Sequence, residues 1–281
     1  MMIDNLKPRL GLYEKAISNT LTWEEKFCLA WQSGFDFLEL SIDTTQARMG
    51  RLYDTGFAST LKRAAKNTGF NVRTLALTAN RGFPLGSEDA TVRDKGLELV
   101  NRAVELAAET GIRLIHLAAY DELDAKRNEH TMSLFEEAVR ICAHEAESYS
   151  VMLALESMDT GAYCGMDDIM KLLREVNSPF LGCYADIGNL TATGHDPKIE
   201  FEKGKGRIVG IHLKDALPGV CRDVPFGEGI VDFDGGLRAL YASGYRGSFV
   251  AETWYHDDKA SHVMLPGVSA FLRAKLEASF R

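Results

Sequence analysis

The chain has 281 residues, of which 46% are hydrophobic and 26% charged, a composition typical of a soluble globular protein with a large core. Its 40 acidic and 32 basic side chains give a formal net charge of -8, which argues against nucleic acid as a partner. No apolar run reaches the length of about 18 residues needed to span a membrane, and the N-terminus lacks the apolar segment of a secretion signal, so a cytoplasmic protein without a membrane partner is expected.

Short apolar, β-branched or aromatic segments recur along the chain and predict eight β-strands. In chain order they are 10–13, 35–42, 72–77, 114–119, 151–155, 181–185, 208–213 and 248–251. The intervening segments carry apolar residues at three- and four-residue spacing, most clearly in 94–110 and 130–149, which predicts amphipathic helices. Several strands follow a glycine typical of a helix end, namely Gly34, Gly69, Gly111 and Gly244.

The order helix, glycine, buried strand is typical of a repeated βα unit. Eight such units, with strands too apolar to face water, predict a closed parallel (β/α)₈ TIM barrel. A doubly wound open sheet is the alternative architecture. Because no linker or low-complexity segment marks a boundary, residues 1–281 are expected to form a single domain.

Two further features follow from the chain as a whole. The five cysteines are odd in number and form no CxxC pair, which predicts reduced, mostly buried thiols rather than disulfides or a cysteine zinc site. The longest break between predicted elements is 217–229, after the seventh strand. A loop of that length at the C-terminal end of a barrel strand is expected to be functional.

Polar side chains end four successive predicted strands, at the rim where barrels of this class carry their reactive groups. They are Glu156, Asp186, His212 and Glu252. Three carboxylates and an imidazole at one rim repel each other unless a cation is present. Such a set suits a divalent metal, Zn²⁺ or Mn²⁺, with Mg²⁺ or Co²⁺ as alternatives. Helix capping or salt bridges at the barrel mouth are the alternative explanation for each residue taken alone.

Longer segments distributed over the chain carry a family resemblance. They are LGLYEKA, FDFLELSID, RGFPLGSED, ALES, YADIGNL, IHLKD, PGVxxxVPFGEGxVDF and SGYRGSFVAETW. These segments, which run from about Gly11 to about Trp254, resemble the L-ribulose-5-phosphate 3-epimerase (L-xylulose-5-phosphate 3-epimerase) family of the xylose-isomerase-like TIM-barrel group.

The resemblance implies a metal-dependent isomerase that inverts C3 of a ketopentose 5-phosphate, with the four residues above on the family's metal-ligand positions. It also implies that Glu156 and Glu252 move the proton, that Tyr13 packs beside the sugar, and that the protein is a homodimer. The chemistry is consistent with this assignment. A C3 hydrogen beside a C2 carbonyl becomes acidic when a cation stabilises the enediolate, and inversion needs an acid and a base on opposite faces.

The substrate phosphate needs cationic donors, and the candidates are Lys214, Arg222 and Arg81. Asn189, three residues after Asp186, is a candidate for bonding a sugar hydroxyl, with a turn residue as the alternative. Ser87 is expected to cap the helix that follows it. His116, near the end of the fourth strand, is expected to be a hydrogen-bonded wall residue rather than a ligand.

Three other functions fit parts of the pattern. An aldose–ketose isomerase or another sugar epimerase would use the same metal and carboxylates. An apurinic-endonuclease-type DNA-repair nuclease shares the barrel but needs further histidines, including one at the position of Asn189. A non-catalytic sugar-phosphate binding protein would have no use for two glutamates at a metal.

Overall fold

The computed structural model describes residues 7–123, 128–256 and 261–280. Residues 1–6, which belong to the N-terminal stretch used to predict the absence of a secretion signal, lie outside them. Within the described residues, no helix is both long enough and apolar enough to cross a membrane.

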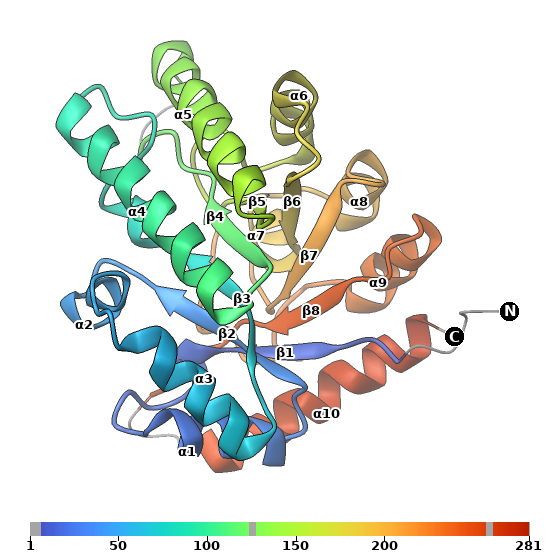
Figure 1. Ribbon diagram of the computed structural model, residues 1–281. Coiled ribbons are helices and arrows are strands. Elements are labelled where there is room, and N and C mark those ends of the chain that lie inside the picture. Colours follow the sequence, from blue (N-terminus) through green and yellow to red (C-terminus); the bar gives the residue numbers. More distant parts are fainter. Residues whose placement is uncertain (1–6, 124–127, 257–260, 281) are drawn as a thin grey trace, which may run out of the picture.

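The eight strands form one closed parallel barrel in sequence order, with helices around its outside (Figure 1). The predicted (β/α)₈ barrel is confirmed, and the open-sheet alternative is wrong because β1 also pairs with β8. The strands are β1 Leu10–Tyr13, β2 Phe37–Ile42, β3 Val72–Leu77, β4 Leu114–Ala118, β5 Met152–Glu156, β6 Leu181–Asp186, β7 Ile208–Leu213 and β8 Ser248–Ala251. Each differs from its predicted bounds by two residues or fewer at either end.

The helices cover the barrel, and all but the last, which follows β8, lie between successive strands. They are α1 Trp23–Gln32, α2 Gln46–Met49, α3 Phe57–Thr68, α4 Ala90–Thr110, α5 Glu129–Ser148, α6 Met166–Val176, α7 Ile187–Ala192, α8 Pro197–Lys203, α9 Phe233–Ala242 and α10 Ser261–Ser279. Single 3₁₀ turns occur at Glu14–Ala16, Gly50–Leu52 and Ala79–Arg81. The four glycines predicted to follow helices all have positive φ, between 73° and 92°, so this part of the sequence interpretation is confirmed.

Helix α4 begins earlier than its apolar periodicity predicted. The carboxylate of Asp89 accepts a hydrogen bond from the backbone N–H of Thr91 at 2.8 Å, so Asp89 caps the helix. The prediction that Ser87 caps it is therefore wrong. The first turn of α4 is polar, so the spacing of apolar residues did not indicate that the helix begins at Ala90.

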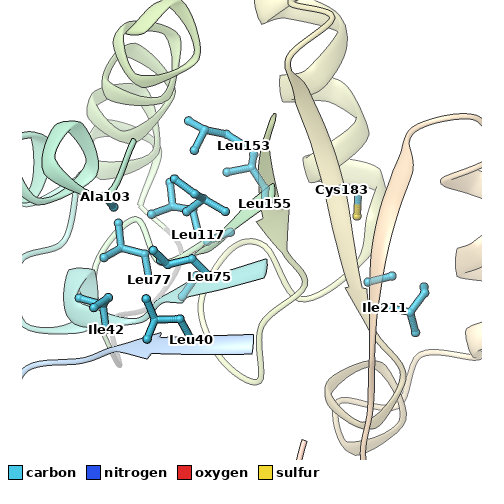
Figure 2. Close-up of a cluster of buried hydrophobic side chains, with 14 of the residues drawn as sticks. Leu40, Ile42, Leu75, Leu77, Ala103, Leu117, Leu153, Leu155, Cys183 and Ile211 are labelled. Atoms are coloured by element: carbon cyan, nitrogen blue, oxygen red, sulfur yellow. The ribbon is translucent and has the colours of Figure 1, made fainter. Parts of the chain in front are cut away.

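Alternate strand residues face the helices and form the main core. Figure 2 shows part of this cluster, in which Leu75 and Leu77 of β3 and Leu117 of β4 lie near Ala103 of α4. These side chains are fully buried. Because side chains of a strand alternate between its two faces, the residues between them point into the barrel.

The barrel interior contains a separate small apolar cluster made of Tyr13, Phe37, Ala76 and Val250. Toward the C-terminal rim the inward-facing positions carry polar or charged side chains that are nonetheless buried. They include Glu39, His116, Tyr184 and His212. Burying ionisable groups in this way is costly unless they are paired, so this end of the barrel is where a functional site is expected.

The long segment after β7 is held in place by one buried carboxylate. Asp215 accepts hydrogen bonds from the backbone N–H groups of Ala216, Gly227, Gly229 and Val231, at 2.8 to 3.3 Å. The predicted 217–229 loop is therefore ordered at the rim.

All five cysteines are free, as predicted. Three of them are buried, Cys164 is half-buried and Cys28 is exposed.

Candidate active site

The structure brings together the four side chains that the sequence placed at strand ends. Glu156 and Asp186 are the last residues of β5 and β6, His212 lies one residue before the end of β7, and Glu252 directly follows β8. Each offers a ligand atom, and these atoms all lie within 4.8 Å of one another. The parallel barrel delivers the C-terminal ends of its strands to one rim, which is why residues so far apart in sequence meet there.

The two ring nitrogens of His212 have different surroundings. Nδ1 lies 2.9 Å from Glu156, 3.6 Å from Glu252 and 3.7 Å from Asp186. Nε2 lies on the other side and donates a hydrogen bond of 2.6 Å to Oε1 of Glu39. Burial lowers the pKa of His212, but the carboxylates of Glu39 and Glu252 outweigh it and raise the pKa well above its ordinary value.

Glu39 is a buried carboxylate that the sequence analysis missed. Its second oxygen accepts a hydrogen bond of 2.9 Å from the hydroxyl of Tyr184. Burial raises the pKa of Glu39, yet the neighbouring His212 and His116 lower it below its usual range. The available signal was that Glu39 is the single charged residue of β2, a strand that is buried along its whole length.

His116 lines the wall of the barrel, but neither of its ring nitrogens makes a hydrogen bond, so the expected hydrogen-bonded wall residue is not found. It lies directly beside the metal-ligand candidates, and with Glu39 and His212 it forms a second group that could hold a metal ion. Its Nε2 is 3.0 Å from Oε2 of Glu156, and its ring packs against His212 with centroids 4.9 Å apart. Burial raises the pKa of Glu156, but His116 and His212 outweigh it and hold the pKa well below its ordinary value. Glu156 is therefore ionised in this surrounding.

Lys214 lies among the carboxylates rather than free in solvent. Its ammonium is 2.8 Å from Asp186 and 2.7 Å from Glu252, and the residue is almost fully buried. Burial lowers the pKa of Lys214, but the two carboxylates raise it well above its ordinary value. This cation compensates charge at the same position where the sequence predicted a metal, so Lys214 is not available as a separate phosphate donor in this arrangement.

The donor set fits a divalent metal. Three carboxylates and one imidazole nitrogen converge, and the second nitrogen of the imidazole donates to a carboxylate, which is the usual support of a metal-bound histidine. Oδ2 of Asp186 is fully buried, and it pairs with the ammonium of Lys214 at 2.8 Å without accepting a hydrogen bond. A cation at this position would satisfy that oxygen and relieve repulsion among the three acids.

A cavity of about 110 Å³, the mouth pocket, opens directly above these residues. Its lining residues include Tyr13, Lys15, Arg81, Glu156, Asp159, Asn189, Lys214, Arg222, Glu252 and Trp254. All five residues predicted to touch substrate therefore line one pocket together with both glutamates. A larger cavity of about 540 Å³ lies at the opposite end of the barrel, near the first residues of β3, β4 and β8, and none of the candidate residues lines it.

Tyr13 and Asn189 are held in place by neighbours. The hydroxyl of Tyr13 is 3.2 Å from that of Ser41, and burial raises the pKa of Tyr13. The side-chain amide of Asn189 donates to the carbonyl of Ser157 at 2.9 Å, while its Oδ1 is buried without a hydrogen-bond partner. Asn189 lies in the short helix α7, so the turn alternative for this residue is wrong.

Arg81 and Arg222 share one acidic partner, Asp159, which the sequence analysis also missed. Nη2 of Arg81 is 3.6 Å from Oδ1 of Asp159, and Nη2 of Arg222 is 3.4 Å from Oδ2. Two of the three predicted phosphate donors therefore meet at one point of the mouth pocket.

Comparisons with known proteins agree with this geometry. The family described as xylose isomerase-like TIM barrel matches residues 27–274. L-ribulose-5-phosphate 3-epimerase UlaE of Salmonella paratyphi A is 42% identical over 87% of this chain and 87% of its own length. SgbU of Escherichia coli strain K12, provisionally assigned as an L-ribulose-5-phosphate 3-epimerase, is 39% identical over 97% of this chain and 98% of its own.

The chain belongs to the L-ribulose-5-phosphate 3-epimerase family. It is an enzyme of the isomerase class, as the sequence predicted. Among solved structures, an L-ribulose 3-epimerase superposes with a TM-score of 0.80, covering 97% of this chain and 95% of that one. At 18% identity that likeness shows the shared fold alone.

Proposed function

We propose that this family member inverts C3 of a ketopentose 5-phosphate, interconverting L-ribulose 5-phosphate and L-xylulose 5-phosphate. The observation that supports it most directly is the meeting of Glu156 and Glu252 with Asp186 and His212 at the floor of the mouth pocket. The names of the curated relatives supply the substrate.

The four residues would hold one divalent metal, Zn²⁺ or Mn²⁺ in preference to Mg²⁺ or Co²⁺. When bound, this ion supplies Lewis-acid polarisation of the C2 carbonyl, which makes the C3 hydrogen acidic. Asp186 and His212 act only as ligands. Glu39 orients His212 by accepting from its Nε2.

Glu156 and Glu252 carry the proton. They come from β5 and β8, so they can approach a planar enediolate from different sides. One takes the C3 proton, the other returns one to the opposite face, and their roles exchange in the reverse reaction. Glu156 is ionised beside its two histidines, which is the form that a base requires.

The remaining lining residues orient the substrate. Arg81 and Arg222 bind the phosphate, Asn189 bonds a sugar hydroxyl through its free Oδ1, and Tyr13 packs beside the sugar carbons. Lys214 lies 2.7 Å from Glu252 and balances its charge, so it does not bind the phosphate in this proposal. The homodimer and the single domain over residues 1–281 remain predictions.

The test is to incubate metal-loaded protein with L-xylulose 5-phosphate in D₂O and follow the reaction by NMR. C3 inversion together with deuterium uptake at C3 is expected. An aldose product with deuterium at another carbon would indicate an aldose–ketose isomerase, and binding without exchange would indicate a binding protein. Either result would refute the proposal.

A further inference from the structure

We propose that Asp159 occupies, in the free enzyme, the position that the substrate phosphate takes between Arg81 and Arg222. The site would then select phosphorylated ketoses by exchanging one anion for another. This inference rests on the proposed function, because it concerns the phosphate end of the same substrate.

The geometry around Asp159 is that of an anion site. Its two carboxylate oxygens each face one guanidinium group, Oδ1 toward Arg81 at 3.6 Å and Oδ2 toward Arg222 at 3.4 Å. Both separations exceed the 2.7–2.9 Å that is usual for a charge-assisted pair. The two arginines are thus gathered around one carboxylate without either forming a tight pair with it.

Arg81 and Arg222 still have N–H groups available to donate to a further anion. Nε of Arg81 is buried and makes no hydrogen bond, and the side chain of Arg222 is 48% exposed. A phosphate dianion offers three acceptor oxygens where a carboxylate offers two, so it can satisfy more of these N–H groups.

Tyr120 completes the anion site. Its hydroxyl accepts a hydrogen bond from Arg81 and donates one to Asp159. The ring of Tyr120 also lies 5.0 Å from the Arg81 guanidinium, which keeps that side chain in place. Tyr120 would therefore transfer its hydroxyl hydrogen bond from the carboxylate to a phosphate oxygen when the anions exchange.

The other cations of the mouth pocket have different partners. Lys15 is 2.7 Å from Asp43, and Lys214 is bound by the acids of the proposed metal site. Within the described lining of the pocket, this leaves Arg81 and Arg222 for a phosphate. Asp159 follows Glu156 by three residues, so the segment after β5 contributes both to the anion site and to the site of proton transfer.

The carboxylate of Asp159 is charged at neutral pH. Burial raises its pKa, but the hydrogen bond from Tyr120 and the charge of Arg81 lower it below the usual range. A charged Asp159 neutralises one guanidinium before substrate arrives. It must leave the anion site or repel a phosphate there, because two anions at contact distance destabilise each other.

The test measures the dissociation constant of inorganic phosphate for metal-loaded protein by calorimetry at constant ionic strength. Asp159→Asn should tighten phosphate binding about tenfold or more, because it removes a competing negative charge whose repulsion is worth at least about 1 kcal/mol at contact distance. Arg81→Gln and Arg222→Gln should each weaken it by a similar factor. Glu109→Gln and Arg102→Gln, which remove one charge each from ion pairs on the surface of α4, should leave it unchanged.

Unchanged or weaker phosphate binding by the folded Asp159→Asn protein would overturn the inference. So would phosphate binding that survives both arginine substitutions, which would indicate binding to the metal. A crystal of the unmodified protein soaked with phosphate gives an independent measurement if a variant fails to fold. The anion should lie between the two arginines with Asp159 turned away, and an anion elsewhere overturns the inference.

Failure of this inference can be separated from failure of the proposed function. If the unmodified protein shows no deuterium uptake at C3, the epimerase proposal fails, whatever the phosphate measurements give. If uptake occurs and the substitutions leave phosphate binding unchanged, only the anion-exchange inference fails.

Discussion

Nε2 of His212 donates a 2.6 Å hydrogen bond to Oε1 of Glu39, a residue 173 positions away in sequence. This bond orients the imidazole so that Nδ1 faces the three acids. Glu39→Gln should therefore weaken metal affinity about 10- to 100-fold, the usual cost of losing such support, while the barrel stays folded. Competition with a chromophoric chelator measures the affinity, and Glu98→Gln on the surface of α4 is the control. Equal affinities in all three proteins would show that Glu39 does not support the metal.

Replacing each acid by its amide should affect the rate of C3 exchange differently for the two glutamates and for Asp186. Glu156→Gln or Glu252→Gln should reduce C3 exchange by about 10²- to 10⁴-fold even in protein with full metal content, because a proton carrier is lost. Asp186→Asn should reduce exchange only in proportion to the metal it loses. Exchange rates from NMR are compared with metal content from atomic emission. A metal-replete Glu252→Gln protein with normal exchange would refute the two-glutamate scheme.

Gly210 makes room for the ring that holds Glu39. A Cβ atom at this position would lie 2.4 Å from Cε2 of Tyr184. Gly210→Ala should push the ring away from Glu39 and lower the free energy of unfolding by about 1–3 kcal/mol, the usual cost of overpacking. Metal affinity should fall with it.

Urea unfolding and the chelator assay check the effect of Gly210→Ala. Gly267→Ala is the matched control, since nothing lies within 4 Å of its added methyl group on the outside of α10. The control should raise the free energy of unfolding by roughly 0.5–1 kcal/mol, because alanine favours helix over glycine. Normal stability and affinity in Gly210→Ala would contradict the packing argument.

Glu14, in the 3₁₀ turn that follows β1, is the centre of a buried ion-pair group. Its carboxylate is 2.8 Å from Nζ of Lys26 and 2.6 Å from Nη1 of Arg51, and it also accepts from the backbone N–H of Ser41. Glu14→Gln leaves the buried Lys26 and the half-buried Arg51 without their acid. The free energy of unfolding should fall by roughly 3–5 kcal/mol at neutral pH.

The effect of Glu14 should depend on pH in a defined direction. Burial raises its pKa, but Arg51 and Lys26 outweigh burial and lower it from 4.5 to about 2 in the folded protein. A lowered pKa means that the stabilisation is complete above pH 4.5 and is lost as the pH falls toward about 2. The difference between the unmodified and Glu14→Gln proteins in urea unfolding should shrink over that interval. A constant difference would show that the charge of Glu14 is not responsible.

The sequence alone determined the barrel and the rim residues of its later strands. The last four residues of segments such as 72–77 and 208–213 are buried on both faces, and the glycines before strands take a backbone conformation that other residues avoid. These are properties of short stretches of chain. Glu156 and Asp186 could be proposed because each ends such a stretch.

Only the tertiary structure decided which partners those residues have. Glu39 lies inside an apolar strand, and its contact with His212 exists because β1 and β8 pair and close the barrel. Asp159 meets Arg222 across 63 positions, and Lys214 turns toward Glu252 rather than toward solvent. Local patterns encode burial and backbone conformation, whereas distances of 3 to 4 Å between side chains depend on strand register and barrel closure, which arise only when the whole chain is folded.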